Sequence, residues 1–348
     1  MLRYNTGMND SNWQIFGHDW AVKLLRTHAG SDKLRHAYLL VGPQGVGKQT
    51  LALRFAQAIN CENPPQPGGF CGVCRTCRQI GTISHPDLDL LKPEKGHKDV
   101  LIDQVRELQR RLSLSPYIAP YRIALLPDFQ RTTIEAMNAL LKTLEEPAEK
   151  VVLLLTADAL ESLLPTVVSR CEVIRLRPTS LKEAQSYLQS TFELSDEKAA
   201  LFAHLSGGRI GAAVNLAQDP DALTQREKHL GDFLELIPAT LDERFKLAKD
   251  LSSPYDKARE KTGVVLPIWL SFWRDVFLRS FDSDLPLVNI DLTTQVDQMA
   301  SQIEAAAARD LVIAHEKAFQ QLDSYANVRL LVENLMLRWP RVQLTTKL

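Results

Sequence analysis

A glycine-rich loop at residues 42–48 is the part of this chain best suited to chemistry. It reads Gly-Pro-Gln-Gly-Val-Gly-Lys and stands between an apolar run, 38–41, and a segment, 51–59, with apolar residues at helical spacing. In such a unit the glycines let backbone N–H groups converge on a phosphate, the helix adds the positive end of its dipole, and the lysine reaches the β- and γ-phosphates. The loop therefore predicts a nucleotide site rather than a glycine-rich turn with a chance lysine. Its phosphate-binding residues would be Gly42, Gly45, Gly47 and Lys48.

The ligands for the Mg²⁺ ion that accompanies a nucleotide are missing from their expected positions. A loop of this kind carries Ser or Thr directly after the lysine, but here the residue is Gln49, whose amide is a poor ligand for a hard octahedral cation. The apolar run at 123–126 would normally end in an acidic metal ligand, but Pro127 follows it. Asp128 comes one residue later, where strand alternation turns it to the other face. We therefore do not expect Mg²⁺-dependent hydrolysis, and ATP binding stays an open question.

Four of the five cysteines stand close together, with the spacing C-x9-C-x2-C-x2-C. Residues 62–70, between the first and second of them, are rich in Pro and Gly and have little apolar content with which to build a core. Four thiolates from one compact loop can form a closed tetrahedral Zn²⁺ site, which indicates a structural metal rather than a catalytic one. A redox dithiol and free buried thiols are the alternatives. The predicted zinc ligands are Cys61, Cys71, Cys74 and Cys77.

The elements that position these residues alternate between short apolar runs and helical patterns. Such alternation predicts an α/β domain with a parallel sheet and flanking helices, up to about residue 178. The arginine-rich helix expected from Asp103 has a basic outer face, which is either simply solvated or meets a DNA backbone. The expected strands are 38–41, 88–91, 123–126, 151–155 and 172–176, and the expected helices are 12–30, 51–60, 103–112 and 132–146.

Composition limits the partners and the compartment. The formal net charge is −1 and 24% of residues are charged, so no global basic field exists, and contact with nucleic acid would be local or shared with partners. No stretch of eighteen apolar residues occurs, and residues 1–11 are polar and lack the pattern of a signal peptide. We expect a cytoplasmic protein that does not enter a membrane.

The C-terminal half reads as helical throughout. Three short helices at 181–192, 196–205 and 211–218 suggest a small lid, and Asp219-Pro220-Asp221 marks a boundary. Long amphipathic patterns beyond it predict an all-α domain of about five helices. The expected domains are residues 1–178 with the cysteine module at 61–77, the lid at 179–221, and an all-α domain at 222–348.

Taken together, these motifs resemble the AAA+ clamp-loader subunits of bacterial DNA polymerase III. The resemblance spans about residues 12–178, and the remainder matches mainly in length and helical character. It is closest to the members of the family whose own ATP site is inactive. The stretches that carry it are His36-Ala37-Tyr38-Leu39 leading into the phosphate loop, the four cysteines, His85-Pro86-Asp87, Asn138-Ala139-Leu140-Leu141-Lys142-Thr143-Leu144-Glu145-Glu146-Pro147 and Ser169-Arg170-Cys171.

The resemblance implies a role within an assembly. The family's gamma/tau subunits hydrolyse ATP, whereas its inactive relatives act as a stator in a five-membered ring. In the family the arginine of Ser-Arg-Cys reaches into a neighbour's ATP site, so Arg170 would be an arginine finger offered in trans, the alternative being an ordinary surface ion pair. A nucleotide-sensing arginine of the family's ATPases falls on Ile210, while Arg209 stands one residue earlier and is expected to point elsewhere. The all-α domain would join a collar of subunits.

Three functions are compatible with these residues. The first is a non-hydrolysing clamp-loader stator, with gamma/tau and delta subunits as partners, the sliding clamp as an indirect partner, and primer-template DNA reached through the assembled ring. The second is an active ATPase of the gamma/tau type, which requires turnover despite Gln49 and Pro127. The third is a zinc-stabilised AAA+ adaptor or repair protein outside replication.

Overall fold

The structure is a computed structural model that describes residues 13–281, 283–323 and 327–343. The polar segment 1–11, on which the expectation of no signal peptide depends, lies outside this range. None of the described helices combines the length and the apolar character needed to cross a bilayer.

The chain forms two compact units. One consists of residues 1–191 together with 208–213, and the other of 192–207 together with 214–348. Each has hydrophobic core of its own, built on a sheet in the first unit and on helices alone in the second.

A five-stranded sheet forms the centre of the N-terminal unit. Its strand order is β2-β3-β4-β1-β5, and every neighbouring pair is parallel. Parallel sheets bury both faces, which explains why the strands are continuous apolar runs. The strands are β1 (Ala37–Val41), β2 (Leu88–Leu90), β3 (Arg122–Leu126), β4 (Val151–Ala157) and β5 (Glu172–Arg175).

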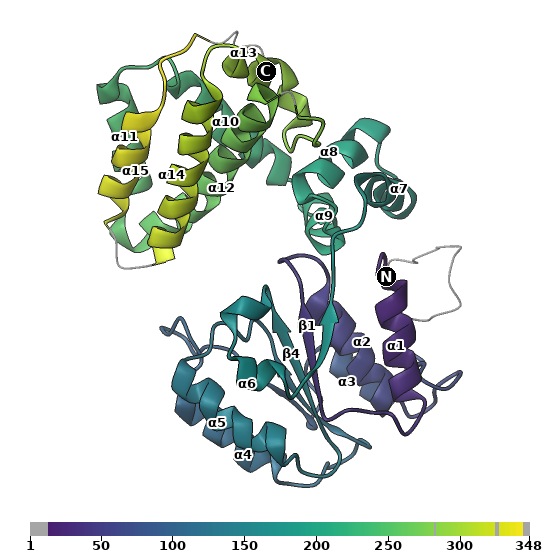
Figure 1. The fold of residues 1–348 in the computed structure, drawn as a ribbon. Coiled ribbons are helices and arrows are strands. Elements are labelled where there is room, and N and C mark those ends of the chain that lie inside the picture. The colour runs from purple at the N-terminus through teal and green to yellow at the C-terminus, as the bar shows by residue number, and fades with distance from the viewer. Residues whose placement is uncertain (1–12, 282, 324–326, 344–348) are drawn as a thin grey trace. The chain divides into compact units, whose positions relative to one another are not determined.

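Helices cover both faces of this sheet (Figure 1). One core cluster joins the sheet to α1, α2 and α3, and another joins it to α4, α5 and α6. The predicted α/β fold with flanking helices is therefore confirmed. The helices are α1 (Asp19–Ala29), α2 (Lys48–Asn60), α3 (Arg75–Gly81), α4 (Ile102–Leu112), α5 (Ile134–Glu145), α6 (Pro165–Val168) and α7 (Leu181–Phe192).

Several helix boundaries differ from the expected ones by one to seven residues, and two of them concern the start of a helix in the sequence argument above. The helix expected over 12–30 begins only at Asp19, because Gly17 has a φ of +78° and His18 is not helical. The helix expected from Asp103 begins at Ile102, so Asp103 lies within its first turn and is not the N-cap. An acidic residue in the first turn still interacts favourably with the helix dipole.

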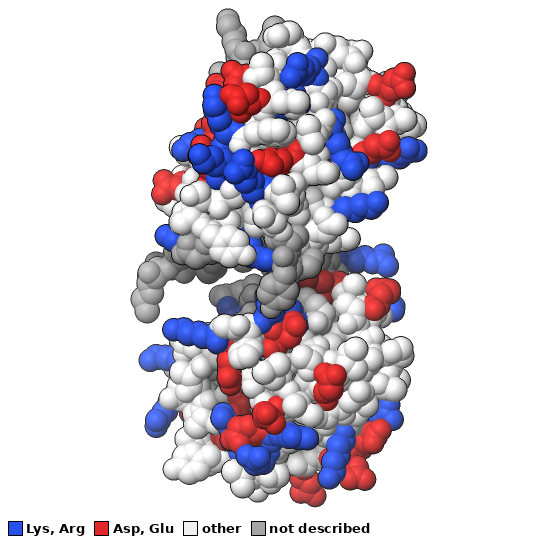
Figure 2. All heavy atoms as spheres, turned by 90° about the vertical axis from the view of Figure 1, so that its left-hand side faces the viewer, with Lys and Arg blue, Asp and Glu red and all other residues white. Residues whose placement is uncertain are grey.

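Charges of both signs are mixed over the surface. On the face shown in Figure 2, lysine and arginine side chains stand among acidic ones. The arginines of α4 are paired in the same way, Arg106 with Asp103 at 3.3 Å and Arg110 with Glu107 at 3.0 Å. The outer face of α4 is therefore largely neutralised within its own helix.

The C-terminal unit is an all-helical assembly around an aromatic core. Phe233 packs edge-on against Trp339 at 5.0 Å between ring centroids, and Trp269 and Trp273 lie beside them. Six α-helices follow residue 222 in the described part of the chain, where about five were expected. The helices from 196 onward are α8 (Asp196–Ser206), α9 (Ile210–Gln218), α10 (Ala222–Leu236), α11 (Leu241–Leu251), α12 (Tyr255–Ser280), α13 (Thr293–Ala300), α14 (Ala305–Asp323) and α15 (Val328–Arg338).

Candidate functional site

The phosphate loop, residues 42–48, connects β1 to α2 as its sequence predicts. Gly47 caps α2 with a φ of +106° and Gly45 has a φ of +78°, conformations that L side chains rarely adopt. A Cβ on Gly45 would stand 2.7 Å from the Cβ of Ala212, since the first turn of α9 lies against the loop. The Ala212 N–H donates a 3.0 Å hydrogen bond to the Gly45 carbonyl. The two glycines thus provide both the turn and the close approach of α9.

Lys48 is buried at the start of α2, and its ammonium group is already paired. Its Nζ lies 2.6 Å from Oδ1 of Asp158 and also donates to the Gly42 carbonyl. The second carboxylate oxygen of Asp158 accepts from the side-chain amides of Gln44 and Gln130. Since Asp158 directly follows β4, which neighbours β1 in the sheet, the strand delivers the carboxylate to the loop. The carboxylate here neutralises the lysine as a nucleotide phosphate would.

The two expected Mg²⁺ positions carry no ligand suited to the ion. Gln49 is exposed on the first turn of α2, and Pro127 directly follows β3. Asp128 has a φ of +48°, and its backbone N–H donates a 3.0 Å bond to Oγ1 of Thr156. The chain therefore bends away from its strand direction just where an acidic metal ligand is expected.

Arg209 departs from its expected direction. The position matched to the sensing arginine falls on Ile210, and Arg209 was predicted to point elsewhere. Instead, Nη1 of Arg209 donates a 3.4 Å hydrogen bond to the Gln44 carbonyl in the phosphate loop. The prediction was wrong because the turn at Gly207 and Gly208, both with positive φ, brings Arg209 toward the loop before α9 begins.

A pocket of about 650 Å³ adjoins this loop. Residues 17–20, 175 and 177–180 line it, together with Glu183. His18 links pocket and loop, because its Nε2 lies 3.0 Å from the Val46 carbonyl oxygen, and burial lowers the pKa of this histidine. The pocket has the size of an ordinary small-molecule site.

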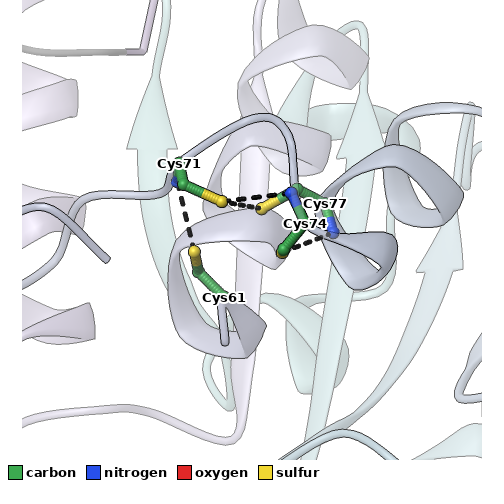
Figure 3. Close-up of side chains that lie close together, drawn as sticks. All are labelled: Cys61, Cys71, Cys74 and Cys77. Atoms are coloured by element: carbon green, nitrogen blue, oxygen red, sulfur yellow. Dashed lines mark hydrogen bonds between the residues drawn. The ribbon is translucent and has the colours of Figure 1, made fainter. Parts of the chain in front are cut away.

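The four clustered cysteines converge on one point at the start of α3 (Figure 3). Their sulfur atoms all lie within 4.8 Å of one another, and the Cys71 and Cys77 sulfurs are 4.0 Å apart. A tetrahedral zinc site with Zn–S bonds of about 2.3 Å requires sulfur separations of about 3.8 Å. The cluster, Cys61, Cys71, Cys74 and Cys77, can therefore hold a metal ion with little adjustment.

Backbone amides around the cluster favour thiolate over thiol. The N–H groups of Cys71, Cys74 and Cys77 donate to the sulfurs of Cys61, Cys71 and Cys74, respectively, over 3.1 to 3.3 Å. Burial opposes ionisation of Cys71, yet amide N–H donors led by that of Cys74 lower its pKa to about 6. Burial raises the pKa of Cys77 and of Cys61. A bound cation would stabilise the ionised form of all four thiols, so the cluster could hold a metal ion.

The cysteine module is also tied to the domain by its own contacts. Glu62 accepts hydrogen bonds from both the hydroxyl and the N–H of Thr76, at 2.7 and 3.1 Å. From α2, Gln57 donates to the Cys77 carbonyl at 2.7 Å, while Trp13 Nε1 donates to the Gly68 carbonyl at 3.2 Å. The Pro- and Gly-rich excursion is thus held at both of its ends.

Arg170 lies just after α6 with its side chain 35% exposed. Its Nη2 is 2.6 Å from Oε1 of Glu145, the last residue of α5. Its Nη1 donates to the Thr166 carbonyl at 2.8 Å and lies 3.4 Å from the Ser169 hydroxyl. The guanidinium is therefore held at the surface of the N-terminal unit.

Comparison with known proteins finds similarity to subunits of DNA polymerase III. A family model described as DNA polymerase III, delta subunit, matches residues 17–180. The delta prime subunit of Bacillus subtilis (strain 168) is 28% identical over 317 residues, which cover 91% of this chain and 94% of that protein. The delta prime subunit of Escherichia coli (strain K12) is 27% identical over 305 residues, 87% of this chain and 88% of that protein. This chain is similar to the delta prime subunits of DNA polymerase III from several bacteria.

A tau subunit is also similar, but less completely. DNA polymerase III subunit tau of Bacillus subtilis (strain 168) is 26% identical over 339 residues, 88% of this chain but only 57% of that protein. These two delta prime relatives are matched along most of their length, so the similarity runs through both units of this chain.

Two acidic residues at these sites were missed in the sequence. Asp158 could have been found, because it directly follows a buried strand, and the C-terminal ends of neighbouring parallel strands meet at the edge where ligands bind. Glu145 carries no such signal: it ends an amphipathic helix, and nothing in the spacing identifies Arg170 as its partner. Their pairing is a result of tertiary packing between α5 and α6.

Proposed function

We propose that this chain is the delta prime subunit of a bacterial clamp loader and that it acts as a non-hydrolysing stator. It would take part in loading the sliding clamp on primed DNA while neighbouring gamma/tau-type subunits hydrolyse ATP. By itself it would be an accessory subunit, cytoplasmic like the polymerase it serves, and no enzyme.

The observation that carries this proposal is the state of the phosphate loop. Both Mg²⁺ ligand positions are lost, at Gln49 and Pro127, while the loop lysine is paired with Asp158. Hydrolysis needs a metal to neutralise charge on the β- and γ-phosphates, and it needs a residue that orients the attacking water. A nucleotide could still rest on Gly42, Gly45, Gly47 and Lys48 without turning over.

Within the ring we assign Arg170 to the ATP site of a neighbouring subunit. An arginine finger neutralises charge in the transition state and is worth about 10³ to 10⁵ in rate. The partial exposure of the Arg170 side chain supports this role, because a finger must be reachable from outside its own subunit.

We assign a structural zinc ion to the four cysteines. All four positions of a tetrahedral site would be filled by thiolates, which leaves no position for a substrate or an activated water. The ion would stabilise the excursion of residues 61–77 rather than take part in a reaction.

The remaining assignments follow the family. We propose that residues 1–178 form the AAA+ domain, 179–221 its lid, and 222–348 the part that joins gamma/tau and delta subunits in a collar. The sliding clamp and primer-template DNA would be reached through the assembled ring.

ATP hydrolysis by the isolated chain tests this proposal most directly. Purified protein with Mg²⁺ and primed DNA should show no more turnover than the variant Lys48→Ala, which removes the loop lysine and measures the background. Turnover that exceeds this background and disappears in Lys48→Ala would instead establish an ATPase of the gamma/tau type.

A further inference from the structure

The contacts of Arg170 leave part of its guanidinium free. In Figure 1 the short helix α6 lies beside α5. Glu145 is the last residue of α5, and its carboxylate is 2.6 Å from the Arg170 guanidinium. A guanidinium has five N–H donors. Within the part of the chain that the structure describes, Nη1 directs its hydrogens to Thr166 and Ser169, and Nη2 makes one contact with Glu145. The Nε hydrogen and one Nη2 hydrogen remain for another acceptor.

We propose that Glu145 is a positioning residue for Arg170. It fixes the plane of the guanidinium so that the two remaining donors face outward, ready for a phosphate group bound to a neighbouring subunit. This inference rests on the proposed function, because it concerns the arginine that the chain offers in trans.

The pair contributes little to the stability of the free chain. Both side chains are partly exposed, 35% for Arg170 and 50% for Glu145, and exposed ion pairs are screened by water. The contact has a larger effect if it orients the Arg170 guanidinium. An arginine that is already held in place loses less side-chain entropy when it binds, and a subunit interface that excludes water strengthens the ion pair.

The geometry favours positioning over competition. A carboxylate that blocked the finger would have to occupy the donors that a phosphate needs, and Glu145 takes only one of them. The Thr166 carbonyl accepts a hydrogen bond from Nη1, so that both terminal nitrogens of the guanidinium have a partner within the chain. Without Glu145, the Arg170 side chain could rotate out of the orientation in which its remaining donors face the neighbouring phosphate.

The test uses the complete clamp loader reconstituted with the subunit variants Arg170→Ala, Glu145→Gln, Glu146→Gln and the double variant Glu145→Gln/Arg170→Ala. DNA-stimulated ATPase is measured over a range of ATP concentrations. We expect Arg170→Ala to lower kcat about tenfold or more. We expect Glu145→Gln to lower it about threefold with KM within about twofold, because displacing a catalytic group costs rate more than ground-state binding.

Glu146→Gln is the matched control. It makes the same change of charge one residue later, on an exposed side chain for which no ion pair occurs among the described residues, and kcat should stay at the wild-type value. Thermal denaturation and gel filtration of each complex separate a loss of rate from a loss of folding or assembly.

The double variant decides whether Glu145 acts through Arg170. If it does, adding Glu145→Gln to Arg170→Ala lowers kcat no further, because the group being positioned is gone. A full threefold loss in both backgrounds, or an increase in kcat with Glu145→Gln alone, overturns the positioning role. No loss with Glu145→Gln while Arg170→Ala slows the reaction also overturns it and leaves the proposed function intact. If Arg170→Ala left kcat unchanged, Arg170 would not be an arginine finger, and the proposed role of this residue would fail.

Discussion

The N-terminal unit buries Lys48 and the C-terminal unit buries Arg244, and the two cations are satisfied in different ways. Lys48 is 7% exposed and pairs with the carboxylate of Asp158. Arg244 is 1% exposed, and in the described part of the chain its guanidinium bonds only to backbone carbonyls. Burial lowers the pKa of Arg244. The carbonyls belong to Leu236, Ile237, Met336, Trp339 and Pro340.

This difference separates a site that can exchange its ligand from one that cannot. The carbonyls around Arg244 lie at the C-terminal ends of α10 and α15, where the helix dipoles are negative and the last carbonyls lack partners within their helix. They are fixed parts of the backbone. The Asp158 carboxylate, by contrast, is 35% exposed and can be hydrated, and in the function proposed here a phosphate would replace it beside Lys48. We therefore expect the partner of Lys48 to be exchangeable, whereas the carbonyls around Arg244 hold the ends of two helices together.

The largest effect is expected at the four cysteines of the N-terminal unit, to which we assign an external ligand, a zinc ion. We expect one zinc per chain, lost on Cys74→Ser. Since structural zinc contributes on the order of 10 kcal/mol in small modules, this change should unfold residues 61–84. Metal analysis measures the loss of zinc, and hydrogen exchange measures the unfolding of residues 61–84. Hydrogen exchange in the C-terminal unit should not change.

The control is Cys171→Ser, which alters the remaining cysteine. Cys171 is outside the cluster, and burial raises its pKa to about 12, so it is a thiol rather than a ligand. This variant should keep its zinc. Metal-free protein with wild-type exchange protection over 61–84 would show that the cysteine module supports itself.

The second test compares Arg244→Met with Lys48→Met, two changes that remove a buried charge and keep an apolar stem. Arg244→Met leaves several buried carbonyls unpaired, and we expect it to lower the stability of the C-terminal unit by about 3 to 5 kcal/mol. Lys48→Met leaves Asp158 with its two glutamine partners and access to water, so about 1 kcal/mol is expected.

Hydrogen exchange under mild denaturant measures the two losses separately, because the residues lie in different units. Equal losses of stability for the two variants would contradict the distinction between a cation with an exchangeable partner and one with fixed partners. A loss with Arg244→Lys close to that of Arg244→Met would show that the planar fork, and not the charge alone, holds the helix ends.

The same distinction explains what the sequence can predict here. The phosphate loop and the four cysteines were readable because glycine, lysine and cysteine at fixed short spacing have few other uses. The strands were readable because a sheet buried on both faces requires unbroken apolar runs, as in β4. Arg244 left no such trace, since its partners are main-chain carbonyls, which every residue has. Its role depends on how α10 and α15 end side by side, and local spacing does not encode that arrangement.

The smallest effect is expected from protonation of a buried histidine, His315, in the core of the C-terminal unit. His315 is fully buried, its Nδ1 donates to the Leu311 carbonyl at 2.8 Å, and its Nε2 accepts from Trp339 Nε1 at 3.3 Å, which requires the neutral ring. Burial lowers the pKa of His315 from 6.5 to about 4. Below pH 6.5 the unfolded chain therefore binds a proton that the folded chain refuses until about pH 4.

Stability of the C-terminal unit should thus fall as the pH drops from 7 to 4, with a contribution from His315 of about 3 kcal/mol. The measurement is the difference in denaturation midpoint between wild type and His315→Gln as a function of pH, because carboxylates titrate in both proteins and cancel. That difference should shrink toward pH 4, because the folded wild type loses the contribution of His315. A constant difference for His315→Gln would mean that the core admits a proton as readily as the unfolded chain does, and the C-terminal unit would then be less closed than the contacts of Arg244 imply.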